Sequence, residues 1–291
     1  MSAAPGFPAY TVSFFTRLHE VVTHLSRSVG APCLRRASCG MVAAVTGRRL
    51  RTLARTLRVE RPARAARRML LPAYVRADIR DHELLVALMG RELREDSDCL
   101  DVGAHAGAVL RQMVRLAPRG RHVAWEPLPA FAAALRDEFP GVEVREAALA
   151  DESGQRELTH VVEQPGWSGL AARPTPFGGP TEALLVQCER LDDVLRHGVR
   201  PAFVKIDVEG AEALVLRGAG ETLRAHRPLI AFEHGRGSAE YHGTGPEDVH
   251  DLLGALGYEI AGLDGDGPYD RERFAAIFAS GERVNFVARA V

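Results

Sequence analysis

Lysine is almost absent from this chain: of its 37 Lys and Arg residues, only Lys205 is a lysine. Aromatic residues make up only 6% of the sequence, and no apolar run approaches the ~18 residues that a membrane-spanning helix needs. The four cysteines, Cys33, Cys39, Cys99 and Cys188, show no C-x-x-C spacing. These absences argue against a transmembrane protein and against a disulfide framework.

The N-terminus lacks a basic start followed by about 7–15 apolar residues, the pattern of a secretory signal. Together with the cysteine usage, this predicts a reduced, cytoplasmic protein. The chain has 291 residues, of which 46% are apolar. This is enough for one α/β domain with a core, plus an extension.

Charge is distributed very unevenly along the chain. Residues 1–80 contain 15 Arg and three acidic residues, a net charge of about +12. The whole chain has a net charge of −1, so residues 81–291 carry a net charge of about −13. We interpret residues 1–80 as an Arg-rich extension, partly helical or disordered, because segment 41–57 alternates apolar residues and Arg at helical spacing. A basic helix on a membrane surface or an acidic partner is the alternative. Nucleic-acid binding is not expected, since the arginines lack interleaved aromatic residues.

From residue 81 onward, short apolar runs alternate with segments of helical spacing. Strands are expected at residues 98–102, 121–125, 142–146, 155–162, 183–189, 203–208, 228–233, 258–261 and 283–288. Helices are expected at residues 81–93, 106–116, 130–139, 191–197, 211–216 and 246–256. The alternation predicts an α/β domain over residues 81–291, with a mainly parallel seven-stranded sheet and helices on both faces. Ligands of such sheets bind at the carboxyl ends of the strands.

A glycine-rich turn, D-V-G-A-H-A-G, follows the first expected strand and runs from Asp101 to Gly107. The dinucleotide pattern G-x-G-x-x-G requires glycine at position 105, where this chain has His105. The spacing from Gly103 to Gly107 therefore favours a cofactor without phosphate, such as S-adenosylmethionine. Asp101 would orient the loop or receive the cofactor's ammonium group. An ordinary tight turn is the alternative.

The second expected strand ends in Trp125-Glu126-Pro127, and Glu126 lies 23 residues after Gly103. An acidic residue at this point of a βαβ unit accepts hydrogen bonds from ribose hydroxyls, although an ordinary surface Glu is the alternative. Segment 147–151 follows the third strand, where an adenine contact would fall. Asp151 is the candidate there.

Three charged residues, Lys205, Asp207 and Glu209, occur where a strongly apolar strand ends. Side chains two residues apart on a strand point to the same face, so these three are expected to converge. Because burying charge is costly unless the charge is paired or used, they are catalytic candidates. A purely structural pair between Lys205 and one of the two acids is the alternative.

The segments DVGAHAG, WEP, CERLDDVL, VKIDVEGAEALVLRGA and RPLIAFEHG, in this order and spacing, resemble the FkbM methyltransferase family over residues 98–262. This resemblance implies a Rossmann-like fold, S-adenosylmethionine as cofactor, and O-methylation of sugar or polyketide-type hydroxyls. The family usually has Asn where this chain has His105, and Phe where it has Trp125. Both carboxylate positions, Asp101 and Glu126, are retained.

Methyl transfer to a hydroxyl requires alignment of the acceptor oxygen and removal of its proton. Asp207 is the expected base, with Glu209, Glu233 and His234 as alternatives from neighbouring strand ends. Asp207, Glu233 and His234 would otherwise form a site for Mg²⁺ or Mn²⁺. The loop 154–180 and the N-terminal arm are expected to shape the pocket for a small-molecule acceptor.

Two other functions share the predicted fold. A nicotinamide-dependent oxidoreductase would use the glycine turn and the acidic ribose partner. However, this chain lacks the second glycine of the dinucleotide pattern, and that function gives no role to VKIDVEGAE. A non-catalytic binding module would keep the fold without the cofactor. The carboxylates Asp101, Glu126 and Asp207 argue against that module.

Overall fold

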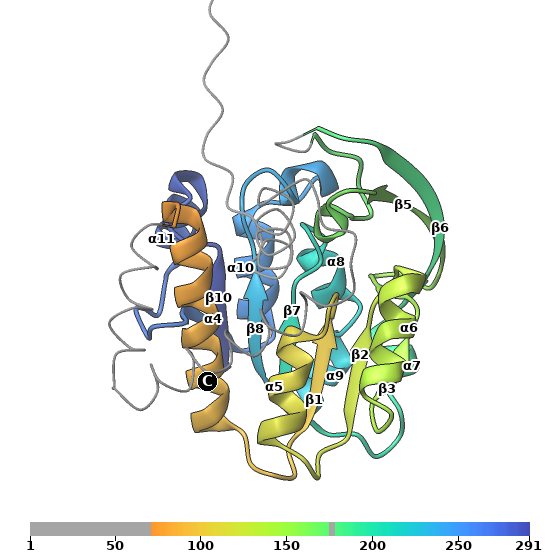
Figure 1. Cartoon of the computed structure of the whole chain (residues 1–291). Coiled ribbons are helices and arrows are strands. Elements are labelled where there is room, and N and C mark those ends of the chain that lie inside the picture. The colour runs from red at the N-terminus through yellow and green to blue at the C-terminus, as the bar shows by residue number, and fades with distance from the viewer. Residues whose placement is uncertain (1–70, 175–177) are drawn as a thin grey trace, which may run out of the picture.

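A seven-stranded sheet forms the centre of the domain in the computed structural model, which describes residues 71–174 and 178–291 (Figure 1). Its strands are β1 (Asp98–Val102), β2 (His122–Trp125), β3 (Glu143–Arg145), β7 (Pro201–Ile206), β8 (Leu229–Glu233), β9 (Tyr258–Gly262) and β10 (Asn285–Ala290). The strand order is β3-β2-β1-β7-β8-β10-β9. Within this described sheet, β10 runs in the direction opposite to the other six strands, and the remaining pairings are parallel. The predicted mainly parallel, Rossmann-like sheet of seven strands is therefore confirmed.

Helices cover both faces of this sheet. They are α4 (Ala73–Glu92), α5 (Ala108–Leu116), α6 (Pro129–Glu138), α7 (Leu191–Val194), α8 (Glu212–Arg217), α9 (Gly220–His226), α10 (Pro246–Ala255) and α11 (Arg271–Ser280). Side chains alternate across a strand. Accordingly, Cys99 of β1 packs in one core with Met113 of α5, whereas Leu100 packs in the other core with Leu223 of α9. Two hydrophobic cores thus hold the helical layers on the sheet.

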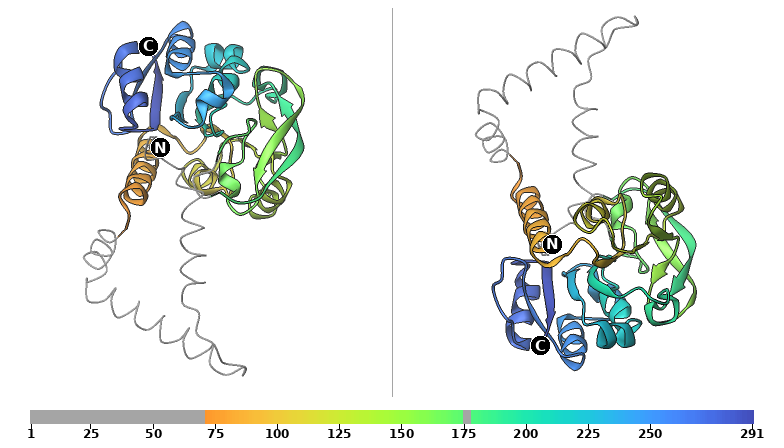
Figure 2. Two further views of the ribbon diagram at one scale, coloured as in Figure 1. Left: turned by 90° about the horizontal axis from the view of Figure 1, so that it is seen from above. Right: turned by 90° about the horizontal axis from the view of Figure 1, so that it is seen from below.

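A second, three-stranded sheet is built from β4 (Ala148–Leu149), β5 (Gly154–Val161) and β6 (Thr181–Glu189), in the order β4-β6-β5. Its β5–β6 hairpin lies on the α6 side of the domain, opposite α11, in both views of Figure 2. The 3₁₀ turn η1 (Pro165–Trp167) lies within this hairpin, and η2 (Ala239–His242) follows β8. The two extra strands predicted around the Gly/Pro-rich loop are therefore present.

The N-terminal limit of the folded part differs from the prediction. Helix α4 begins at Ala73, after Pro72, and not at residue 81, so the expected boundary between residues 80 and 81 falls inside a helix. The spacing of apolar residues does not predict the start of α4, because its inward-facing positions there include an acidic residue. Asp78 is only 4% exposed, and Val75 is also buried. The expected helix at 41–57 lies outside the described residues. No helix of the described residues is long and apolar enough to cross a bilayer.

Candidate active site at the carboxyl edge of the sheet

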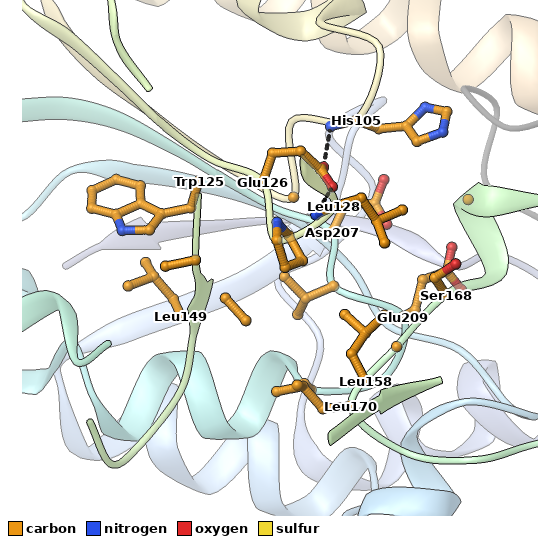
Figure 3. Close-up of a pocket in the computed structure, with 18 of the residues that line it drawn as sticks. His105, Trp125, Glu126, Leu128, Leu149, Leu158, Ser168, Leu170, Asp207 and Glu209 are labelled. Carbon is orange, nitrogen blue, oxygen red and sulfur yellow. Dashed lines mark hydrogen bonds between the residues drawn. The ribbon is translucent and has the colours of Figure 1, made fainter. Parts of the chain in front are cut away.

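A pocket of about 700 Å³, counting space open to solvent, lies at the carboxyl ends of β1, β2 and β7 (Figure 3). The lining comes from the turn after β1, the end of β2, residues 147–149, residues 165–170 around η1, and the turn after β7. The pocket thus lies where parallel α/β sheets bind their ligands.

Gly103 brings the turns after β1 and β7 into contact. Its φ of +76° is a conformation that glycine adopts without strain. A Cβ at this position would lie 1.9 Å from the backbone oxygen of Asp207, so no other residue fits without movement. The Gly103 N–H donates to the carbonyl of Trp125 at 3.0 Å, which also ties the turn to β2.

Glu126 is a carboxylate held at the floor of the pocket, with 4% of its surface exposed. Its Oε2 accepts the backbone N–H of His105 at 2.7 Å, and its Oε1 accepts that of Leu128 at 3.0 Å (Figure 3). Burial raises the pKa of Glu126 to about 7, although both hydrogen bonds oppose the shift. Each ionised oxygen has two lone pairs, so Glu126 can accept two further hydrogen bonds, as from a pair of adjacent hydroxyls.

Two residues without the freedom of glycine adopt positive φ at this pocket, His105 at +47° and Glu209 at +56°. Such conformations are uncommon and concentrate at functional sites. The His105 ring packs on Phe131, with 4.2 Å between ring centroids. His105 therefore contributes its backbone N–H to the site by orienting Glu126, a role that the side-chain chemistry of histidine does not indicate.

Lys205 and Asp207 meet as the sequence predicts. The Lys205 Nζ lies 3.3 Å from Asp207 Oδ2 and 3.7 Å from Asp101 Oδ1, and it donates to the carbonyl of Gly103 at 2.9 Å. Burial opposes the charge of Lys205, but the carboxylates of Asp207 and Asp101 outweigh it and raise the pKa of Lys205. Burial raises the pKa of Asp101, which is fully enclosed. Lys205 thus fixes both Asp207 and the glycine turn.

The chain from residue 101 to residue 260 matches the family model of the methyltransferase FkbM domain. The protein belongs to the FkbM methyltransferase family. It is 30% identical over 156 residues to methyltransferase sdnD of Sordaria araneosa, covering 42% of this chain and 60% of that protein. It is 25% identical over 170 residues to 2-O-methyltransferase NoeI of Sinorhizobium fredii, covering 52% of this chain and 68% of that protein.

Among solved structures, an FkbM methyltransferase from Methylobacillus flagellatus matches with a TM-score of 0.42 at 17% identity, covering 68% of this chain and 44% of that one. The match spans 60% of the length of the sdnD relative and less than half of this solved chain.

Within this FkbM domain, Glu209 does not join Lys205 and Asp207. Strand β7 ends at Ile206, so the alternation expected to bring the three side chains together stops before Glu209. Glu209 forms an ion pair with Arg173, whose guanidinium lies 4.9 Å from the centre of the Trp167 ring. Burial raises the pKa of Glu209 to about 7, although Arg173 opposes the shift. Glu209 still lines the pocket, and its ion pair anchors the segment around η1 over it.

His234 lies outside the pocket of the FkbM domain, contrary to its predicted catalytic role. Its ring is 1% exposed, packs against Phe278, and places Nδ1 3.1 Å from Oε2 of Glu212. The Glu212 Oε1 accepts the backbone N–H of Gly210 at 3.0 Å, so His234 supports the turn after β7. The alternative metal site with Asp207 and Glu233 is not formed either. Within residues 71–174 and 178–291, no three His, Cys, Asp or Glu side chains are arranged to hold a metal ion.

Two predicted cofactor contacts also lie elsewhere. Gly107 caps α5 at φ +72°, where an added Cβ would lie 2.7 Å from Leu135, so its role is close packing. Asp151 pairs with Arg156 at 2.9 Å and does not line the pocket. Residues 147–149 of the same predicted segment do line it. The wall that these three residues contribute to the pocket is apolar.

The sequence does not predict the apolar wall of the pocket that is formed by Leu128, Leu158 and Leu170. The last two come from β5 and from the Gly/Pro-rich loop, which the sequence analysis gives to the acceptor pocket. No periodicity marks this loop. The high glycine and proline content of the loop is the one sequence feature that sets it apart. In the structure, Gly169 of this loop exchanges backbone hydrogen bonds with Thr159 of β5.

Proposed function

We propose that this protein is an S-adenosylmethionine-dependent O-methyltransferase that acts on a hydroxyl of a small-molecule acceptor of sugar or polyketide type. The observation that carries the proposal is the set of polar groups that line the pocket. Three carboxylate residues, Glu126, Asp207 and Glu209, line it, and no Lys or Arg is among its described lining residues. Lys205 and Arg173 pair with Asp207 and Glu209, so the pocket presents carboxylate oxygens as acceptors and no basic side chain to bind the pyrophosphate of a nicotinamide dinucleotide.

The pocket residues fit this cofactor part by part. Glu126 offers acceptors for two ribose hydroxyls, and residues 147–149 with Leu128 offer an apolar surface for the adenine. When bound, S-adenosylmethionine supplies an electrophilic methyl group on a positively charged sulfur. Loss of the methyl removes that charge, so the acidic lining favours the substrate form over the product form.

Asp207 is suited to receive the proton of the acceptor hydroxyl. It lines the cofactor pocket and also a second cavity on the other side of the β7 turn. Lys205, 3.3 Å away, holds its carboxylate in place. A hydroxyl reaching Asp207 from the second cavity would approach the methyl group from the side opposite the cofactor pocket.

The variant Asp207→Asn tests this role, because it keeps the shape of the side chain and removes its charge. We expect turnover of labelled S-adenosylmethionine to fall by about 10²–10⁴, the range for a lost general base, with a much smaller change in cofactor affinity. Loss of activity in EDTA that Mg²⁺ restores would instead make Asp207 a metal ligand. Near-normal turnover in Asp207→Asn would leave the acid as a structural partner of Lys205.

A further inference from the structure

A second cavity, of about 430 Å³, lies beside the cofactor pocket and shares Asp207 with it. Its walls come from α4, the carboxyl ends of β7 and β8, and the start of β10. Its floor is apolar, formed by side chains such as Leu85, Phe232 and Phe286. Polar and charged side chains make up the rest of its lining.

The inward face of α4 changes character along the helix. Its C-terminal half presents Leu88 and Met89 to the core, as expected of a helix packed on a sheet. Its N-terminal half presents Asp78, Asp81 and His82 to the second cavity. This half of α4 therefore lines the cavity with polar side chains, and Asn285 holds Asp81 in place there.

A third cavity, of about 480 Å³, continues from the second along α4. The two share Asp81, Leu263 and Asn285. At this junction the amide of Asn285 donates to Asp81 Oδ2 at 3.0 Å. Among the described residues, the other oxygen of each of these two side chains makes no further hydrogen bond. The junction therefore offers two acceptor atoms, Asp81 Oδ1 and Asn285 Oδ1, and the hydrogen bond between the two side chains fixes their orientation.

The charge of the inner cavity restricts what it can hold. Asp78, Asp81, Asp207 and Glu233 line it, against the single cation Lys205. Burial, and after it the neighbouring Asp207, raises the pKa of Glu233 well above its ordinary value, so this end of the cavity disfavours a further negative charge. A phosphate or carboxylate would add to this repulsion.

In the outer cavity, Arg80 and Arg283 are both engaged by Asp264, at 3.1 and 2.8 Å. Arg283 also lies 3.4 Å from Asp266, so each of these two arginines of the outer cavity has a carboxylate partner.

We propose that the two joined cavities form the acceptor groove, which binds an elongated, uncharged, polyhydroxylated molecule of more than one ring. The Asp81–Asn285 pair accepts hydrogen bonds from acceptor hydroxyls at the junction. Asp207 lies at the inner end, where the reacting hydroxyl would receive the methyl group. This assignment rests on the proposed function. It places acceptor recognition on α4 and β10, outside the segment 101–260 that matches the family.

Saturation-transfer NMR on the full-length protein with saturating S-adenosylhomocysteine tests the groove. The probes are methyl glycosides and trisaccharides of neutral hexoses and deoxyhexoses, with glucuronate and glucose 6-phosphate as anionic counterparts. We expect saturation of at least one neutral sugar, stronger for the trisaccharide than for its monosaccharide, and none of the anions. Asp81→Leu and Asn285→Leu should each weaken that binding at least tenfold, with unchanged affinity for S-adenosylhomocysteine.

Two further variants sharpen the test. Ala77→Trp, at an exposed α4 position that lines only the outer of the two cavities, should remove the preference for the trisaccharide and keep the monosaccharide signal. Asp251→Leu, which removes an exposed acid far from the groove, should change neither. The groove assignment is overturned if no neutral sugar is saturated, if the anions bind equally well, or if folded Asp81→Leu and Ala77→Trp behave as wild type. Wild-type protein that fails to bind S-adenosylhomocysteine would instead overturn the proposed function beneath it.

Discussion

At the scale of single residues, Glu126 couples the site to pH. Its pKa of about 7 means that the carboxylate changes from protonated to ionised across the neutral range. A folded-state pKa above the ordinary value of 4.5 lowers the free energy of unfolding as pH rises from about 4.5 to 7, because the folded protein must give up a proton that it holds more tightly. Ligand binding has the opposite dependence, since only the ionised form accepts hydrogen bonds with both oxygens.

We therefore expect the affinity for S-adenosylhomocysteine to rise by up to about tenfold between pH 6 and pH 8, as Glu126 ionises. Glu126→Gln should lower that affinity at least tenfold at pH 8, since a hydrogen bond to a charged group contributes about 1.5–3 kcal/mol. It should also remove most of the pH dependence. Isothermal titration calorimetry at several pH values measures both effects.

Asp151→Asn is the matched control for Glu126→Gln. It also neutralises an acidic residue, but one that pairs with Arg156 and does not line the pocket. It should leave both the affinity and its pH dependence unchanged. Equal effects of the two variants, or wild-type affinity in Glu126→Gln, would remove Glu126 from the site.

At the scale of elements, the turns after β1 and β7 form one unit. The glycine at 103 allows the turn after β1 to approach the backbone of Asp207, Lys205 bonds across the two turns, and Glu212 with His234 supports the second turn from behind. The Arg173–Glu209 ion pair then attaches the η1 segment to the same unit. The site geometry thus depends on backbone contacts between elements as much as on the side chains of the pocket.

Gly103→Ala should disrupt this unit. The added Cβ would lie 1.9 Å from the Asp207 carbonyl oxygen, and alanine is strained at φ +76°. We expect destabilisation of about 2 kcal/mol or more, together with loss of cofactor binding.

Gly90→Ala is the control for this substitution. Gly90 lies inside α4 with no atom within 4 Å of an added Cβ, so the substitution should stabilise the protein by about 0.5–1 kcal/mol through helix propensity. Urea unfolding of both variants measures these changes. A Gly103→Ala protein of wild-type stability and affinity would show that the close approach of the two turns is not needed.

At the scale of the whole molecule, the fold could be predicted from the sequence more fully than the site. Strand β1 was predicted residue for residue, because Cys99, Leu100 and Val102 form a short, largely apolar segment that leads directly into a glycine turn. Helices α9 and α11 and strand β4 were missed. Helix α9 has only seven residues, α11 has its apolar residues in one short run, and β4 has only two residues.

The site was predicted only in part, for a physical reason. Gly103, Glu126 and Asp207 follow strands directly, so the architecture alone brings them together. Gly107, Asp151 and His234 also lie near strand ends, but local packing or a nearer partner turns each away. Which neighbour a side chain finds depends on tertiary contacts that spacing along the chain does not encode.

The position of α4 leads to a prediction about where the folded domain begins. A chain that starts at Leu71 should fold and bind S-adenosylmethionine as the full chain does. A chain that starts at Asp81 loses the buried Val75 and Asp78, so it should unfold at lower temperature and transfer methyl groups poorly. Thermal unfolding and turnover of the two truncations give the comparison. Equal behaviour of both would return the boundary to residue 81.

The proposed function requires that the acidic pocket after the glycine turn binds S-adenosylmethionine. Calorimetric titration of the full-length protein with S-adenosylmethionine and with NAD⁺, under the same conditions, measures this binding. Three carboxylate residues and the lack of Lys and Arg among the described lining residues predict saturable binding of S-adenosylmethionine and none of NAD⁺. Binding of NAD⁺ with no binding of S-adenosylmethionine would contradict the claim.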